Sequence, residues 1–478
     1  MAEESGVQVS SEAGTGASTR SKWSGKWAFI LAAAASAVGL GNMWRFPYLA
    51  AKYGGGIFLL TYIVLVVTFG FALMMAETAL GRKTGQSAIG AFSALRKNWK
   101  FVGILASLVP FIITPYYALI GGWVTKYMIS YAVTPAATMT QDGYFTGFIL
   151  QNPETYLWLI VFLLAVYLVV SLGLKNGIER VNRVLMTALI IMSLGIAIYA
   201  ATLPGALDGI AYYLIPDFSK FSVSLVIGAL GQMFYSLSLA MGIMITYGSY
   251  FEKKHDLEQS VRRIEVFDSG IALMAGFMII PAAFAAFGTG EAVAENAGPG
   301  LMFVILPTVF DSIGPAGRIL GFIFFLLVFF AALTSCISLF ETCVSIVADG
   351  LKRARATAIA IAGIFILALA IFVDMGYNSL LWMDPMHNFF GFGEYQDFQL
   401  LDFFDFLSNT ILMPIVALLT CIFIGYVIKP DAIIDEVRIS SKFKGAGLFT
   451  VMVKYIAPVF LVIILVSYTL STMGVISI

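Results

Sequence analysis

Long apolar runs separated by short polar segments make up most of this chain. A helix needs about 20 apolar residues to cross the hydrocarbon core of a bilayer. About eleven segments meet that length; they are residues 27–50, 57–80, 101–131, 154–174, 181–203, 221–250, 266–288, 302–347, 356–373, 406–428 and 450–476. The pattern predicts an all-α polytopic membrane protein with about eleven transmembrane helices.

The composition agrees with that prediction. Of 478 residues, 60% are hydrophobic and only 12% are charged, and the mean hydropathy is +0.91. Residues 1–19 differ from the rest because they are rich in Ser, Gly, Ala and Glu and contain no apolar run. We therefore expect them to form a disordered tail rather than a signal peptide or a membrane span.

Lysine and arginine indicate how the chain crosses the membrane, since basic residues accumulate in short cytoplasmic loops. All but five of the 28 basic residues fall on one predicted side, and the exceptions are Arg45, Lys52, Lys126, Lys220 and Arg318. The pattern predicts a cytoplasmic N-terminus. With an odd number of spans, the C-terminus is then extracytoplasmic.

Two predicted spans are interrupted by polar and small residues. Residues 36–47 of the first span include Gly39, Gly41, Asn42 and Arg45, and residues 231–242 interrupt the sixth. A break at membrane depth persists only where the freed backbone groups line a cavity or bind something. The alternative is that small residues merely permit close packing of helices.

The two breaks open two halves of five spans each. Halves with an odd number of spans insert with opposite topology, as in the inverted repeats of many secondary transporters. We therefore expect a 5+5 inverted repeat with broken helices 1 and 6. The predicted organisation is a tail at 1–19, a first repeat at 20–203, a second at 204–428, and a cytoplasmic loop with the eleventh span at 429–478.

Several motifs resemble those of the neurotransmitter:sodium symporter family, specifically its bacterial eleven-span amino-acid transporters. The motifs are AVGLGNMWRFP at 37–47, GGG at 54–56, ETALGR at 77–82, PYY at 115–117, GIER at 177–180, GQMFYSLSLAMG at 231–242 and AALTS at 331–335. The resemblance covers the chain after the tail. It implies sodium-coupled import of a small molecule by alternating access, in a bacterial inner membrane.

The resemblance implies two sodium sites built from oxygen ligands, which hard cations prefer. The first would use Ala37, Asn42, Ser236, Asp268 and the carboxylate of the substrate. The second would use Ala35, Val38, Ala331, Thr334 and Ser335. For Thr334 and Ser335 alone, hydroxyls that bond to carbonyls one turn back in an ordinary helix are the common alternative.

Gly39 bears on the substrate because relatives that move monoamines resemble one another in having Asp at the matching position. Without that carboxylate, the substrate is expected to bring its own. Backbone amides near Leu40 and Gly41 and the Tyr117 hydroxyl would hold it. The resemblance implies a side-chain pocket without fixed charge, formed by Val38, Ile113, Tyr117, Tyr235, Ser236, Ser238, Ala240, Met241, Met244, Ser335 and Leu339.

Such a pocket favours a neutral, hydrophobic α-amino acid, because a charged side chain would lose its hydration there. The sequence does not choose between leucine-like and tryptophan-like substrates.

Asp268 departs from many relatives, which have Asn at this position. Chloride-dependent relatives resemble each other in a Ser about four residues later, where this chain has Ala272. We expect the Asp268 carboxylate to supply the negative charge, so that no chloride is required, with Asp268 or Glu77 as candidates for proton counter-movement. The alternative is that Asp268 caps a helix at its cytoplasmic end.

The resemblance also implies gates on both sides of the site. On the extracellular side Arg45 would pair with Asp402, with Asp405 as the other candidate, above a lid of Tyr117 and Tyr235. The cytoplasmic gate would pair Arg20 with Asp349, supported by Trp23, Ser249 and Tyr250.

Other classes of protein fit the chain less well. An ion channel needs a polar stripe through several spans, whereas the polar groups here gather at two breaks. A membrane enzyme needs converging acids, bases or metal ligands, and His255 and His387 fall on opposite predicted sides. A transporter-fold amino-acid receptor without concentrative transport is the remaining alternative.

Overall fold

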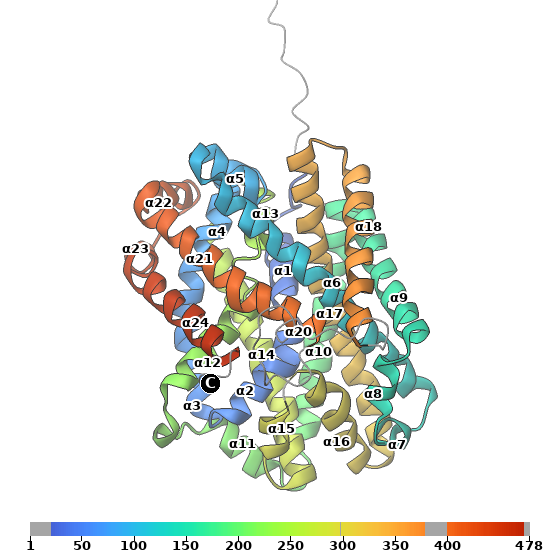
Figure 1. The fold of residues 1–478 in the computed structure, drawn as a ribbon. Helices are drawn as coiled ribbons and strands as arrows, with labels where there is room; N and C mark the ends of the chain where they lie inside the picture. The colour runs from blue at the N-terminus through green and yellow to red at the C-terminus, as the bar shows by residue number, and fades with distance from the viewer. Residues whose placement is uncertain (1–20, 297, 378–398, 473–478) are drawn as a thin grey trace, which may run out of the picture.

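A computed structural model of the chain describes residues 21–296, 298–377 and 399–472 (Figure 1). These residues are arranged as helices, and no β-strand is present among them. The prediction of an all-α polytopic protein is confirmed. The predicted tail at 1–19, Arg20 and His387 lie outside the described residues.

Nine helices within the described residues are long and apolar enough to cross a membrane. They are Gly56–Thr84, Lys97–Val133, Pro153–Ser171, Leu174–Ala201, Leu257–Phe287, Pro315–Leu351, Arg355–Tyr377, Leu400–Val427 and Ala446–Ser471. A tenth span is bent by 55° between Lys26–Ala37 and Gly41–Lys52. The predicted sixth span consists of α12 (Val223–Ser236) and α13 (Ile243–Ser249), each too short to cross alone. The count of eleven therefore stays a prediction that depends on counting α12 and α13 as one span.

Figure 1 labels the parts of these spans separately where the helical geometry changes. The parts are α1 (Lys26–Ala37), α2 (Phe46–Lys52), α3 (Gly56–Leu65), α4 (Phe71–Thr84), α6 (Lys100–Val133), α9 (Asn152–Ser171), α10 (Arg180–Ala201), α14 (Leu257–Phe287), α17 (Pro315–Leu351), α18 (Arg355–Asp374), α20 (Leu400–Asp405), α21 (Met413–Ile422), α23 (Ala446–Val451) and α24 (Ala457–Thr472). Short helices in the connections are α5 (Ala88–Leu95), α7 (Ala136–Met139), α8 (Tyr144–Ile149), α11 (Ala206–Leu214), α15 (Glu291–Glu295), α16 (Leu306–Ser312) and α22 (Asp431–Arg438). The apolar run at 302–347 thus contains both a connecting helix and most of α17.

The two predicted breaks are present. In the first, Val38 leaves the helix with an extended backbone after α1 ends at Ala37. In the second, Ser238 and Ala240 have φ values of 53° and 59°. The left-handed region costs a residue with a side chain roughly 1–2 kcal/mol. Contacts from the surrounding spans must therefore hold the second break in shape.

The broken spans lie in the interior of the bundle. α1 contacts α10, α13, α14 and α17, and α6 packs along α17 across the middle of the molecule. By contrast, α9, α10, α18 and α24 have many exposed apolar side chains, such as Leu164, Ile191, Ile364 and Val459. The outer spans therefore present the lipid-facing surface, and the inner ones enclose the two breaks.

Candidate functional site

The two helix breaks line one small cavity, with a volume of about 20 Å³. Most residues predicted to bind the substrate line it, namely Ala37, Gly39, Leu40, Gly41, Ile113, Tyr117, Tyr235, Ser236, Ser238, Met241, Ser335 and Leu339. Three predicted residues, Val38, Ala240 and Met244, are buried beside the cavity but do not line it. The sequence prediction missed Ser36 and Ile243, which do.

A buried polar cluster joins the first break, the second break and α14. Asn42 Nδ2 donates to Ser236 Oγ at 3.0 Å and to Asp268 Oδ1 at 2.8 Å. Ser236 Oγ donates to both oxygens of Asp268, at 2.8 and 2.9 Å. Tyr62 OH donates to Asp268 Oδ2 at 3.3 Å. Three of the side chains expected at the first sodium site, those of Asn42, Ser236 and Asp268, thus lie within hydrogen-bond distance of one another.

The interpretation of Asp268 as a helix cap is wrong. α14 begins at Leu257, and its cap is Asp256, whose side chain accepts a hydrogen bond from Gln259 N at 2.9 Å. Asp268 lies well inside the helix, with none of its surface exposed. A buried carboxylate is retained in a protein interior only when donors or cations satisfy it. Its side-chain donors here are Asn42 and Ser236, which line the cavity, and Tyr62 on α3.

Of the residues expected at the second sodium site, Ser335 contacts the first break. Ser335 Oγ on α17 donates to Ser36 O at 3.0 Å and to Val38 O at 3.1 Å, and lies 3.5 Å from Ala35 O. Thr334 Oγ1 instead donates to Ala331 O at 3.1 Å, within its own helix. The local hydroxyl-to-carbonyl pattern therefore applies to Thr334 but not to Ser335, which reaches across to the first break.

A set of donors surrounds the position of Gly39. Leu40 N donates to Tyr117 OH at 3.1 Å, and Gly39 N donates to Asn42 Oδ1 at 3.0 Å. A Cβ on Gly39 would lie 2.7 Å from both Tyr117 OH and Ser335 Oγ. This spacing leaves no room for a side chain there, and it places amide and hydroxyl donors where a carboxylate can be held.

Glu77 on α4 holds the second break. Its Oε1 accepts a hydrogen bond from Ala240 N at 2.7 Å, and Ser238 Oγ donates to Ser36 O at 3.2 Å. The second oxygen of Glu77, Oε2, is buried without a partner. These contacts stabilise the two left-handed residues of the break.

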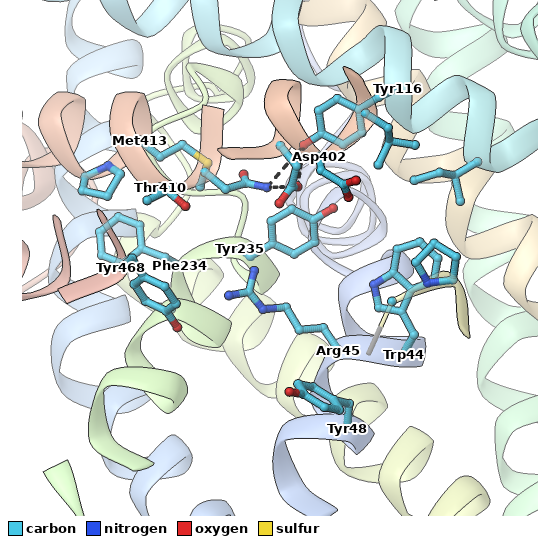
Figure 2. Close-up of a pocket in the computed structure, with 18 of the residues that line it drawn as sticks. Trp44, Arg45, Tyr48, Tyr116, Phe234, Tyr235, Asp402, Thr410, Met413 and Tyr468 are labelled. Carbon is cyan, nitrogen blue, oxygen red and sulfur yellow. Dashed lines mark hydrogen bonds between the residues drawn. The ribbon is translucent and has the colours of Figure 1, made fainter. Parts of the chain in front are cut away.

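A larger cavity of about 340 Å³ lies on the other side of Tyr235 (Figure 2). Tyr235 lines both cavities, and the Arg45 guanidinium lies 5.8 Å from the centre of its ring. Asp405 interacts electrostatically with Arg45 and accepts hydrogen bonds from Tyr116 and Asn409. Asp402 accepts a hydrogen bond from Gln399 N at 3.1 Å and so caps α20. Arg45 thus has an electrostatic interaction with Asp405, and its pairing with either aspartate stays a prediction.

The predicted cytoplasmic gate is partly assembled. Trp23 Nε1 donates to Tyr247 O at 3.1 Å, and the Trp23 ring packs edge-on against Tyr247 and Tyr250. Ser249 does not join this group through its hydroxyl, which donates to Thr246 O in its own helix. Asp349 Oδ2 accepts from Ser87 N at 2.9 Å, and its predicted partner Arg20 is outside the described residues.

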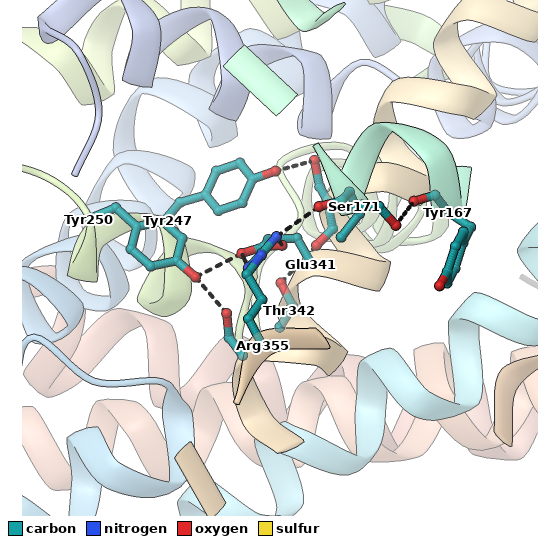
Figure 3. A network of polar contacts seen from close by, with 10 residues as sticks. Tyr167, Ser171, Tyr247, Tyr250, Glu341, Thr342 and Arg355 are labelled. Carbon is teal, nitrogen blue, oxygen red and sulfur yellow. Dashed lines mark hydrogen bonds and ion pairs between the residues drawn. The ribbon is translucent and has the colours of Figure 1, made fainter. Parts of the chain in front are cut away.

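The structure contains an ion pair beside this gate that was not predicted from the sequence (Figure 3). Arg355 at the start of α18 forms two hydrogen bonds with Glu341 on α17, at 2.9 and 2.6 Å. Tyr250 OH donates to the same Glu341 at 2.9 Å and lies 2.5 Å from Ser345 Oγ. The only sequence signal was an acid inside a long apolar run. The network joins the second half of the broken sixth span to α17 and α18.

Comparison with known proteins decides the family. A model described as the sodium:neurotransmitter symporter family matches residues 20–141 and 149–475. The chain belongs to the sodium:neurotransmitter symporter family. An uncharacterized sodium-dependent transporter of Haemophilus influenzae is 34% identical over 94% of this chain and 98% of its own length. The uncharacterized sodium-dependent transporter YhdH of Bacillus subtilis is 33% identical over 95% and 98%, respectively.

A solved structure is also similar to this chain. It is the crystal structure of MhsT in complex with L-phenylalanine, at 33% identity, covering 94% of this chain and 99% of that chain with a TM-score of 0.81. The chain thus shares the fold of that structure, and by its family it is a membrane-embedded, sodium-dependent transporter.

Proposed function

We propose that this protein is a sodium-coupled symporter that imports a neutral, hydrophobic α-amino acid by alternating access. The observation that carries the proposal is that both helix breaks line one cavity. Hydrogen-bond donors surround Gly39, which has no side chain and so contributes no carboxylate. A zwitterion satisfies such a site, because its carboxylate takes the amide and hydroxyl donors and its ammonium takes backbone carbonyls. The complex of the similar protein MhsT with L-phenylalanine supports the same class of substrate.

The apolar part of the cavity supports the choice of side chain. Ile113, Met241 and Leu339 line it together with the ring of Tyr235. A charged side chain would lose its hydration among these groups without gaining a partner. The small present volume means that Met241 or the lid of Tyr117 and Tyr235 moves when an amino acid enters. Methionine adapts easily to such changes.

Two sodium ions accompany the substrate in this proposal. The first ion lies near Asn42, Ser236 and Asp268 and is shared with the substrate carboxylate, which couples ion and substrate directly. The second lies between the carbonyls of the first break and Ser335. At each site the sodium ion replaces hydrogen bonds that these groups now make with each other. Their oxygen atoms suit a hard cation as ligands.

Transport is proposed to be independent of chloride. Asp268 brings a full negative charge to the cluster of Asn42, Ser236 and Tyr62. A fixed carboxylate at this place removes the need for a mobile anion to balance the sodium charge.

The N-terminus is proposed to be cytoplasmic and the C-terminus extracytoplasmic, in the inner membrane, with repeats at 20–203 and 204–428.

Uptake by purified protein in proteoliposomes tests the proposal. Each labelled amino acid is supplied singly, with an inward sodium gradient or with choline in place of sodium, and in chloride or gluconate. Concentrative uptake of a neutral, hydrophobic set with sodium, equal in the two anions, is the expected result. Sodium-dependent binding without accumulation would instead identify a receptor. A strict need for chloride would overturn the role of Asp268.

A further inference from the structure

An apolar groove lies on the outer surface of the bundle, far from the two helix breaks in the sequence. Its walls come from α9 and α18, and its floor is Phe340 of α17; its volume is about 290 Å³. Leu164 on one wall is 53% exposed and Ile364 on the other is 71% exposed. Because both walls belong to helices that cross the membrane, the groove opens into the hydrocarbon of the bilayer.

Gly363 keeps this groove open. A Cβ at this position would meet only Phe340 Cζ at 3.7 Å and Tyr167 Cδ2 at 3.9 Å, which are ordinary contact distances. The space beyond is the groove itself, so a larger side chain would fill it. Figure 3 shows the Tyr167 ring pointing away from the neighbouring Glu341–Arg355 pair, and Tyr167 is one of the residues that line the groove.

The groove lies within one leaflet of the joined ends of its two walls. The ends of α9 and α18 are joined where Arg355 Nη2 donates to Val170 O at 3.1 Å. The near end of the groove lies beyond this contact, at Tyr167 on α9 and Ala360 on α18, and its far end is at Ile160 and Leu367. We measure the reach of the groove from Val170 to Ile160 and from Arg355 to Leu367. At 1.5 Å per residue these distances are roughly 15 and 18 Å. Half of the hydrocarbon core is about 15 Å thick.

The connections beyond the near end of the groove carry positive charge. Lys352 and Arg353 are exposed in the turn between α17 and α18, and Lys175 is exposed just after α9. Arg355 adds no net charge, because Glu341 neutralises it in the ion pair. By the distribution of basic residues, this end faces the cytoplasm. Basic residues beside a gap between spans on that side recognise anionic lipid headgroups.

We propose that the groove between α9 and α18 is a binding site for an anionic phospholipid of the cytoplasmic leaflet. One acyl chain lies along Gly363 over Phe340, and the phosphate lies between Lys175 and the Lys352–Arg353 turn. Phe340 directly precedes Glu341, which bonds to Tyr250 at the cytoplasmic gate. The bound lipid therefore contacts the helix segment that holds this gate.

Native mass spectrometry of the full-length protein tests the site. The probes are palmitoyl-oleoyl phosphatidylglycerol and phosphatidylcholine with the same chains. We expect one tightly held phosphatidylglycerol on the unaltered protein and no comparable phosphatidylcholine. Gly363→Leu should lower the bound fraction at least about tenfold by filling the groove, and K175Q/K352Q/R353Q should do the same by removing about three headgroup interactions.

Two matched controls separate the site from general effects. Gly195→Leu makes the same change on lipid-facing α10, where nothing lies within 4 Å of the added Cβ. R96Q/K97Q/K100Q removes three exposed basic residues from another loop on the same side. Both controls should keep the lipid. Equal binding of the two lipids, or unchanged binding in Gly363→Leu and in K175Q/K352Q/R353Q, would overturn the proposal. Loss of a dimer in Gly363→Leu would also overturn the proposal, because a second copy of the chain would then be the occupant of the groove.

Discussion

Asn42 Nδ2 lies 2.8 Å from Asp268 Oδ1, and this contact ties the broken first span to the middle of α14. An uncharged amide thus meets a buried carboxylate at the place where a cation is proposed to bind. The carboxylate is satisfied by donors alone in this arrangement, and a sodium ion would add the missing positive charge.

Replacing Asp268 with Asn should weaken sodium dependence strongly. The variant keeps a side-chain oxygen but loses the charge, and a charge-assisted interaction contributes about 1.5–3 kcal/mol. The sodium concentration for half-maximal uptake should therefore rise about tenfold or more. Asp374→Asn is the matched control, because that buried carboxylate bonds to Thr155 at 2.7 Å, away from both breaks. An unchanged sodium requirement in Asp268→Asn would exclude Asp268 from the ion site.

Replacing Gly39 with Ala should impair substrate binding. The added Cβ would lie 2.7 Å from Tyr117 OH and Ser335 Oγ, so both hydroxyls have to shift. Overpacking typically costs about 1–3 kcal/mol, and we expect at least about tenfold weaker amino-acid binding, measured by scintillation proximity. Gly25→Ala is the control, since nothing lies within 4 Å of its added Cβ. Equal affinity in the two variants would remove Gly39 from the substrate site.

The two candidate partners of Arg45 should respond differently to loss of charge. Asp405→Asn removes the electrostatic attraction to Arg45, whereas Asp402→Asn leaves it in place. A cysteine at Thr410, which lines the outer cavity, reports access from outside. The three native cysteines are buried and give little background.

We expect labelling to be about threefold faster in Asp405→Asn, because an attraction between two charged side chains of this kind contributes up to about 1 kcal/mol. Asp402→Asn should label at the unaltered rate. The reverse order would assign the gate to Asp402.

Tyr250→Phe should favour the inward-open state. Its hydroxyl bonds to Glu341 and so connects α13 to the Glu341–Arg355 pair. Removal of this hydrogen bond costs the closed cytoplasmic side about 1 kcal/mol. A cysteine at Ser249 should then react about fivefold faster from the cytoplasmic side. Tyr426→Phe is the control, since its hydroxyl bonds to Lys454 O elsewhere. No difference between the two variants would count against a gating role for Tyr250.

The sequence by itself determined the membrane architecture and the location of both helix breaks. Apolar length is a local property, because about 20 residues suffice to cross the hydrocarbon wherever they occur. Glycines and polar residues inside such a run are equally local signals, and α1 ends at Ala37 within the predicted first break. The motifs of the family are continuous stretches of residues and are readable without coordinates.

Only the tertiary structure decided that Asp268 does not cap a helix. The apolar run begins at residue 266, which makes Asp268 look like the start of a helix. The helix actually begins at Leu257, because its first turns consist of mostly polar residues that precede the apolar run. Asp268 is therefore internal, and its partners Asn42, Ser236 and Tyr62 come from three other helical segments.

The tertiary structure also decided that Glu341 pairs with Arg355 and that Gly363 lines a groove. Each of these depends on the rotation and crossing of helices that are distant in sequence. Apolar periodicity sets which segments are buried, but buried side chains on two helices meet only when packing fixes their relative orientation. For that reason the elements could be predicted from the sequence, and the contacts between them could not.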